Sequence, residues 1–346
     1  MLFRVLALLF FCAARAAAAE QVLQPPPTSV VYSVRDAAAI KQFRTNPAVV
    51  RAMVNRLVMA ATRQPDIAKA WASLVSPEDK IGIKISAAGG ELFTTHSDVV
   101  RAIVDGLVAA GHKRDRIIIW DRALGDIKRA GYGSEGAQLR SIEPRDGFDR
   151  DALFTAPVTG KLIWGDLDFI PRHGESPLKA DSENTSNVSH LARILSKEVT
   201  KIINVPVMTD SYNAGLAGCL YNMTLPNADN WRRFAQFGSV GAYAMAELYN
   251  DDRVGKKVVL HIMDGLVAGY AGGPESHPNF SHHHATLLAS RDPVAIDTLA
   301  LERIEGWRRN AQLPPIGELA AHVPIAGQFG IGNADRARIR VQEVGR

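Results

Sequence analysis

The chain has 346 residues, of which 47% are hydrophobic and 22% charged, and its formal net charge is +4. This composition is that of a globular protein, so a disordered chain, a collagen and a repeat-only coiled coil are excluded. The small net charge argues against a nucleic-acid-binding protein, which usually carries a dense basic surface. Beyond the N-terminal segment there is no long apolar run, so we expect no membrane span there.

The first 19 residues have the pattern of a secretory signal peptide. Arg4 precedes a continuous apolar run over residues 5–12, and residues 17–19 offer a small-residue cleavage site. We therefore expect a periplasmic or secreted protein whose mature chain begins at Glu20; an uncleaved anchor is the alternative. Cleavage leaves Cys219 as the one cysteine, which excludes an intramolecular disulfide.

The mature chain begins with a segment that lacks clear periodicity. Residues 20–45 are expected to form an extended leader, because three prolines follow Gln24. Apolar residues at helical spacing then predict a helix over residues 46–63, and a second, shorter helix is expected over residues 66–74.

The next elements predict a βαβ unit. Residues 81–85 alternate apolar with other side chains, as a strand does. A helix that Thr95 or Ser97 can cap follows and ends at Gly111. Residues 116–120 are a short apolar run, typical of a buried parallel strand. Strand, helix and strand in this order favour a parallel sheet.

The second half of the chain continues the alternation of strands and helices. Residues 131–187 are rich in glycine, aspartate and proline and predict hairpins and long loops. The elements expected after them are a helix over 191–198, strands over 201–206, 258–263 and 285–289, and a helix over 292–304 that Asp292 caps and Pro293 opens.

Together these elements predict an α/β fold: a mostly parallel sheet with helices on both faces and long loop-rich insertions in the middle. We expect a single α/β domain over residues 46–330, with a break near residues 125–195 if it has two lobes. Residues 331–346 are expected to form a basic C-terminal tail.

Polar residues follow several of the expected strands at the point where each strand ends. In open α/β sheets, ligands bind beyond the carboxyl ends of the strands. The strand-end positions are Lys84–Ser86, Asp121–Arg122, Asn204–Asp210 and Asp264–Gly265. Either they form one ligand site, or each caps a strand or forms a turn.

A glycine-rich turn over residues 87–90 follows the Lys84 strand, and Thr94, Thr95 and His96 open the next helix. Backbone amides in such a turn can bind an anion. No Gly-Lys-Ser/Thr follows, so the turn is not a P-loop, and it indicates little by itself.

The histidines are the most conspicuous candidates for a metal site. Imidazole with a nearby carboxylate suits a divalent ion, which makes His261, His282 and His284 candidate metal ligands near Asp264. Consecutive histidines in a strand alternate faces, so at most two of residues 282–284 share one site. The spacing matches no zinc signature, and a polar loop whose imidazoles bond to the backbone is the favoured alternative.

Several blocks of the chain resemble the Domain of Unknown Function 362 family. These blocks occur in family order from about residue 80 to 305: residues 83–85, 95–96, Asp121, 203–206, 218–222, 262–265 and 288–297. The last of them, residues 288–297, is the most specific. The resemblance implies an α/β fold with a largely unassigned role. Some members carry a ferredoxin-like iron–sulfur segment, but this chain has no clustered C-x-x-C run, so we expect no iron–sulfur cluster.

The chain departs from the family at positions that would bind an anion or a cofactor. Where the family tends to have lysine and then histidine after Pro206, this chain has Met208 and Asp210. Where the family tends to have lysine before Asn222, it has Tyr221. Either the ligand differs here or the histidine cluster has taken over part of the role.

The favoured hypothesis is an exported α/β enzyme that acts on a small anionic molecule, metal-assisted or redox-linked. Its candidate catalytic residues are Lys84, His96, Asp264 and Arg291, and its candidate cofactor-binding residues are Asn204, Asp210 and Asn222. The cofactor is open, with a divalent metal as one candidate; the expected partner is a small molecule, not nucleic acid.

Two other functions stay open: a non-catalytic periplasmic binding protein for a metal or an organic anion, and an accessory or structural protein. Arg291 and Asp297 have a structural alternative as well, since they could pair and lock the last long helix to the sheet. Cys219 has apolar neighbours and is expected to be a small buried hydrophobe rather than a nucleophile.

Overall fold

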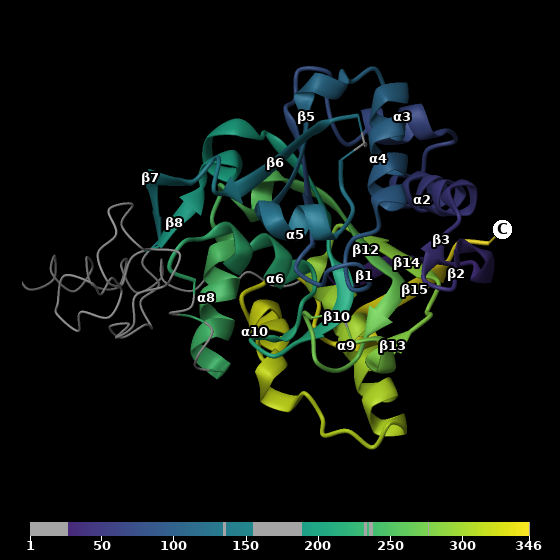
Figure 1. Ribbon diagram of the computed structural model, residues 1–346, viewed down its shortest axis with the longest axis vertical. Coiled ribbons are helices and arrows are strands. Elements are labelled where there is room, and N and C mark those ends of the chain that lie inside the picture. The colour runs from purple at the N-terminus through teal and green to yellow at the C-terminus, as the bar shows by residue number, and fades with distance from the viewer. Residues whose placement is uncertain are drawn as a thin grey trace, which may run out of the picture.

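The computed structural model describes residues 27–133, 136–154, 189–231, 234, 238–275 and 277–345. A single large sheet runs through the centre, with its path of strands in the order β15-β1-β14-β12-β9-β4-β5-β6 (Figure 1). The strands of this sheet are β1 (Ser29–Arg35), β4 (Ile81–Ile85), β5 (Ile117–Ala123), β6 (Gln138–Glu143), β9 (Lys201–Val205), β10 (Val207–Ser211), β11 (Gly215–Leu216), β12 (Val258–Gly269), β13 (Ser281–His282), β14 (Thr286–Ser290) and β15 (Ile339–Glu343).

Parallel pairing dominates the centre of the sheet. Strands β6, β5, β4, β9 and β12 are parallel neighbours, whereas β14 runs antiparallel between β12 and β1. The short pairs β2 (Ile40–Lys41) with β3 (Arg44–Thr45), and β7 (Phe148–Phe154) with β8 (Ser189–Ala192), lie outside the main sheet.

Helices cover both faces of the sheet (Figure 1). Helices α2 (Pro47–Thr62), α3 (Ile67–Ala72) and α4 (Ser97–Ala109) pack on one face in a cluster with the isoleucines of β4. Helices α6 (Cys219–Met223), α8 (Gly238–Asn250), α9 (Pro293–Asn310) and α10 (His322–Gln328) pack on the other, and α5 (Leu124–Arg129) follows β5. The predicted α/β fold with a mostly parallel sheet is therefore confirmed.

Local signals set the starts of α2 and α9 where the sequence predicts them, although α9 ends at Asn310 and not at the expected residue 304. The Asn46 side chain accepts a hydrogen bond from Val49 N at the start of α2. The Asp292 side chain accepts one from Ala295 N at the start of α9. Gly111, with φ of +96°, stands just after α4, where a left-handed conformation favours glycine. The N-cap of α4 is His96, however, and neither Thr95 nor Ser97.

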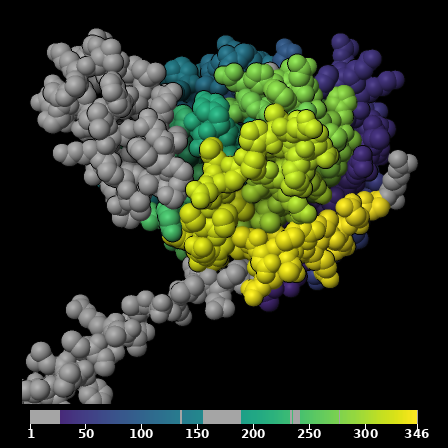
Figure 2. All heavy atoms as spheres, turned by 90° about the horizontal axis from the view of Figure 1, so that it is seen from below, coloured from purple at the N-terminus to yellow at the C-terminus, as the bar shows by residue number. Residues whose placement is uncertain are grey.

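The structure corrects two parts of the expected domain division. Strand β1 lies within the expected leader and β15 within the expected basic tail, yet both belong to the main sheet. Each β15 residue pairs in parallel with β1, from Ser29–Ile339 to Ser33–Glu343. Figure 2 shows the C-terminal residues, in yellow, running across one face of the molecule beside the N-terminal part, in purple.

The expected helix over residues 191–198 is wrong in its first half. Residues 189–192 form β8, which pairs antiparallel with β7, and a short π-helical turn (Ile194–Glu198) follows. Pairing with a strand about 40 residues earlier overrides the local helical pattern. Strands β6 and β7 lie in the region that the sequence predicts to form loops. Residues 134–135 and 155–188 are outside the described residues, and so is the expected signal segment.

Across the described ranges, no helix is both long enough and apolar enough to cross a membrane.

Candidate functional site

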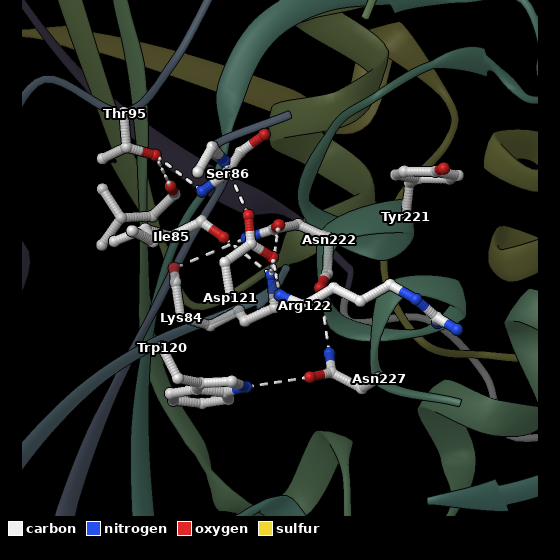
Figure 3. Close-up of polar contacts among 12 residues, drawn as sticks. Lys84, Ile85, Ser86, Thr95, Trp120, Asp121, Arg122, Tyr221, Asn222 and Asn227 are labelled. Carbon is white, nitrogen blue, oxygen red and sulfur yellow. Dashed lines mark hydrogen bonds and ion pairs between the residues drawn. The ribbon is translucent and has the colours of Figure 1, made fainter. Parts of the chain in front are cut away.

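Lys84 lies at the centre of a polar cluster at the carboxyl ends of β4, β5 and β9 (Figure 3). Its Nζ donates to Asp121 Oδ1 at 2.6 Å, to Asn222 Oδ1 at 3.0 Å and to the Ile85 carbonyl at 2.7 Å. Asp121 Oδ2 in turn accepts from Ala87 N at 2.7 Å. The cluster therefore joins two neighbouring strands, the turn after β4 and helix α6.

The ammonium group of Lys84 has no capacity left for a ligand. The side chain is 0% exposed, and burial lowers the pKa of Lys84 while the Asp121 carboxylate opposes that shift. An ammonium group carries three protons, and three protein acceptors already receive them. Lys84 thus holds the cluster together, and a direct catalytic role would require one of these bonds to break.

A chain of buried hydrogen bonds continues from Asn222 through the core. Asn222 Nδ2 donates to Asn204 Oδ1 at 2.8 Å, and Asn204 Nδ2 lies 2.9 Å from His261 Nδ1. His261 Nε2 lies 2.9 Å from the Tyr249 hydroxyl. Burial lowers the pKa of His261 to about 3, so the ring is neutral. Asn204, Asn222 and His261 consequently bind each other and not a cofactor or a metal in this arrangement.

His96 and Asp264 form a second polar group at the same edge of the sheet. Asp264 Oδ2 accepts from the backbone N of His96 at 2.8 Å and lies 2.9 Å from His96 Nδ1. Its other oxygen accepts from Leu266 N at 3.0 Å. Both hydrogen bonds hold His96 at the start of α4, and the one between Nδ1 and the Asp264 carboxylate assigns the ring proton to Nδ1.

The environment of His96 suits proton transfer. Burial lowers its pKa, but the charge of Asp264 and the hydrogen bond to it outweigh this effect, so the pKa of His96 is raised above its usual value. Asp264 is 0% exposed, whereas the His96 side chain is 10% exposed. The described residues offer no hydrogen-bond partner to Nε2, which leaves that nitrogen to exchange a proton with a bound molecule.

A pocket of 520 Å³ lies at the loop that joins β4 to His96. The glycine-rich turn and the two residues after it supply most of its wall, and the lining residues are Ala88, Gly89, Gly90, Glu91, Leu92, Arg129, Glu275 and Pro278. A Cβ at Gly89 would lie 1.9 Å from the Phe93 carbonyl oxygen, so this turn requires glycine. The turn singled out in the sequence thus shapes a cavity beyond the end of β4.

The predicted metal site does not form. His282 stacks on Trp307 with 4.5 Å between ring centroids, and His284 lies against the same tryptophan at 5.2 Å. His261 is opposite Ser290 in the sheet, whereas His282 is opposite Ala268, seven residues further along β12. No group of three histidine, cysteine or acidic side chains in the described ranges could hold a metal ion.

Burial also sets the charge of the two histidines on Trp307. It lowers the pKa of His282, and it lowers the pKa of His284 to about 3, so His284 is neutral at physiological pH. The Nε2 atom of His284 is buried without a hydrogen-bond partner in the described structure. These rings therefore pack as an aromatic cluster, in place of the metal ligands that the sequence suggested.

Asp210 and Arg291, two other candidates, lie apart from the Lys84 cluster. Asp210 Oδ1 accepts from Gly273 N at 2.9 Å, and its other oxygen lies 3.8 Å from Arg308 Nη1. Burial raises the pKa of Asp210. Arg291 is exposed at the end of β14. The predicted cofactor-binding set is therefore split, with Asn204 and Asn222 together and Asp210 elsewhere.

The suggested pairing of Arg291 with Asp297 is wrong. Asp297 accepts instead from the backbone N of Cys219 at 2.6 Å and of Leu220 at 2.9 Å, so it fixes the start of α6. Burial raises the pKa of Asp297 to about 7, although these hydrogen bonds oppose the shift. Cys219 is fully buried and its pKa is raised well above the usual value, as expected of a structural thiol.

The candidate catalytic and cofactor-binding residues omit three residues that complete the polar groups. Asp121 is among the strand-end positions, since it follows an apolar run, but the sequence assigns it no role. No sequence signal stands out for the other two residues. These are Tyr249, in α8, and Thr95, whose Oγ1 donates to the Val205 carbonyl. Their partners come from distant segments, which only the folded chain brings together.

Comparisons with known proteins identify one family and a distantly similar solved structure. The family described as "Domain of unknown function (DUF362)" matches residues 80–302. No curated protein matches the chain. Among solved structures, the chain resembles a Northeast Structural Genomics Consortium target from Thermotoga maritima at 12% identity and a TM-score of 0.40, over 79% of this chain and 61% of that one. The chain thus spans less than two thirds of that protein's length.

Proposed function

The chain belongs to the family of domain of unknown function 362, and from that premise we propose that it is an exported enzyme in which His96 transfers a proton to and from a small molecule. The observation that carries this proposal is the His96–Asp264 pair, 2.9 Å apart at the carboxyl edge of a parallel sheet. At that edge, open α/β folds bind their ligands.

The pair has the parts that general acid–base catalysis requires. Asp264 would orient the ring through Nδ1 and stabilise the imidazolium that forms when Nε2 accepts a proton. Because the pKa of His96 is raised, its acid form would persist to higher pH than in a free histidine. The same group could then return the proton to the product.

The pocket beside the glycine-rich turn, which is lined by the loop that leads to His96 but not by His96 or Asp264 themselves, is the proposed place for the substrate. Its volume of 520 Å³ suits a small molecule. Arg129 is the one cation among the described lining residues and is paired with Asp126, whereas Glu91 and Glu275 favour a hydrogen-bond donor or a cation on the molecule. A substrate that carries a cationic or hydrogen-bond-donating group beside any anionic group would match this lining.

Metal assistance has little support, because His261 lies apart from His282 and His284 along β12 and no group of three histidine, cysteine or acidic side chains in the described ranges could hold a metal ion. Lys84 is proposed as a positioning residue that holds the turn through Asp121, rather than as the cation that binds the substrate. The hypothesis of a redox-linked enzyme rests on the family resemblance alone.

Exchange of protons with solvent gives a test that works before the substrate is identified. The chain that begins at Glu20 is incubated in D₂O with a mixture of hydroxy acids, amino acids and sugar phosphates, followed by NMR. We expect deuterium incorporation or conversion of one component, and a loss of about 10²- to 10⁴-fold in His96→Gln. Asp264→Asn should shift the pH at which the rate rises to lower values, because it removes the charge that raises the pKa of His96.

A matched control exists in the same chain. His190 and Asp229 form a pair with 2.8 Å between Nδ1 and Oδ2, but on β8, outside the main sheet. His190→Gln should leave the rate unchanged. Equal activity of His96→Gln and the unsubstituted chain would overturn the proposal, and ligand-induced thermal stabilisation without turnover would favour the non-catalytic binding protein.

A further inference from the structure

A second cavity, of 460 Å³, lies at the other end of the sheet from His96. It is lined by the start of β1, the end of α2 and the end of β14: Ser29, Val30, Tyr32, Ala61, Thr62, Arg63, Ser290, Arg291, Asp292 and Ile331. Strand β14 runs back along β12, with Thr286 opposite Gly265 and Ser290 opposite His261. Its end therefore points toward the amino ends of the parallel strands, away from the His96–Asp264 pair.

Two exposed arginines give this cavity its charge. Arg63 and Arg291 are both exposed, and neither guanidinium has a hydrogen-bond or ion-pair partner among the described residues. Many other arginines are paired, as Arg140 is with Asp146 and Glu198. An unpaired guanidinium keeps all its donors for a carboxylate or phosphate group, and two of them lining one cavity favour an oxyanion.

The acidic residue in the cavity is already bound within the protein. Asp292 Oδ1 accepts from Ala295 N at 2.9 Å, and Oδ2 accepts from Ser29 Oγ at 2.5 Å and from Asn333 N at 2.8 Å. These bonds fix its carboxylate in place as the cap of α9. Its charge lowers the net charge of the lining from two positive charges to one, and the cavity still favours an anion.

Apolar and aromatic groups complete the lining. Val30, Ala61 and Ile331 contribute apolar surface, and Tyr32 contributes a ring that is mostly buried. A cavity with cationic and apolar lining suits a ligand that has a charged head and an apolar body. Inorganic phosphate alone would leave this apolar surface without a partner.

We propose that this cavity binds a small organic oxyanion, with Arg63 and Arg291 contacting its carboxylate or phosphate and Tyr32 its apolar part. The site is separate from the proposed catalytic pair and does not depend on it. Arg63 and Tyr32 precede the family match at residues 80–302, whereas Arg291 lies within it. The site therefore combines a family segment with segments outside the match.

Calorimetric titration of the chain that begins at Glu20 tests the proposal, with phenyl phosphate, benzoate, inorganic phosphate and benzyl alcohol as probes. We expect saturable binding of phenyl phosphate, benzoate or both, tighter than that of inorganic phosphate, and none of benzyl alcohol. The tighter of the two aromatic anions identifies the head group. Arg63→Gln and Arg291→Gln should each weaken binding about ten- to hundredfold, because each removes a charge-assisted hydrogen bond.

Matched variants distinguish binding in this cavity from binding to exposed arginines elsewhere on the surface. Arg44→Gln removes an exposed arginine on β3 that has no partner among the described residues and does not line the cavity, and it should leave the affinity unchanged. His96→Gln should also leave it unchanged, so failure of the proposed catalysis does not affect this test. No saturable binding of either aromatic anion up to about 10 mM, or an equal loss in Arg44→Gln, would overturn the proposal.

Discussion

At the scale of single residues, the partners of a polar side chain decide its role. Lys84 ends a strand in the sequence and looks available for an anion, but its three donors are all used in the folded chain. His96 has the same strand-edge setting, yet one ring nitrogen stays without a protein partner among the described residues. The sequence makes both residues candidates, and only their hydrogen bonds separate a structural role from a catalytic one.

Lys84→Met should strongly destabilise the protein. The substitution leaves the Asp121 carboxylate buried without its cation, and breaking a buried pair in this way costs about 3–5 kcal/mol. Adding Asp121→Asn should recover part of the loss, because the uncompensated charge is then removed. The free energy of unfolding from urea denaturation at pH 7 measures both effects.

Lys80→Met is the control for this prediction. Lys80 pairs with Glu198 at 3.1 Å, but its side chain is 38% exposed, and solvent screening limits such a pair to about 1 kcal/mol or less. A loss in Lys84→Met no larger than that in Lys80→Met would show that Lys84 does not hold the cluster together.

At the scale of elements, local signals predict helices better than edge strands. The capping residues Asn46 and Asp292 precede their helices in the sequence, and α2 and α9 begin where those residues predict. Strand β15 carries arginine and glutamate on its exposed positions, so its residues resemble a solvated tail. Its place in the sheet depends on pairing with β1, about 300 residues earlier in the chain.

Removal of β15 should therefore destabilise the whole domain. A chain that ends at Asp335 loses the strand that covers the edge of β1, and an uncovered edge promotes aggregation. We expect a lower Tm and light scattering on heating, relative to a chain that ends at Val344. Equal Tm values and no scattering in the shorter chain would mean that the pairing contributes nothing to stability.

At the scale of the whole molecule, the sheet joins the two ends of the described chain. Strands β1 and β15 lie side by side in parallel, with β15 at the edge of the sheet and β1 next to it. The expected signal peptide over residues 1–19 precedes β1 in the sequence and is outside the described residues. Its removal would take away no residue of the sheet.

Expression of the full chain in a bacterium should yield a mature protein that begins at Glu20. The short apolar run and the small residues that follow it favour cleavage after Ala19. Intact-mass measurement of the periplasmic and culture fractions checks this outcome, and a chain without residues 1–19 should stay inside the cell. A full-length protein recovered from the membrane fraction would instead support the uncleaved anchor.

The sequence by itself determined the α/β class, the central strands and the principal helices. These follow from local causes: the alternating apolar residues of β4 and the continuous apolar run at the start of β5 are typical of strands, and Asn46 and Asp292 cap the helices that follow them. The rule that ligands bind beyond strand ends also selected Lys84, Asn204 and Asp264 before any contact was known.

Only the tertiary structure decided which of these residues meet, because their partners are far apart in the chain. Lys84 reaches Asn222, 138 residues away, and His96 reaches Asp264, 168 residues away. Strand register set His261 apart from His282, which their positions in the sequence cannot show. Burial then made His261 neutral, while the Asp264 carboxylate raised the pKa of His96. Spacing along the chain encodes neither distance nor solvent exclusion, and these two quantities determine the chemistry of the site.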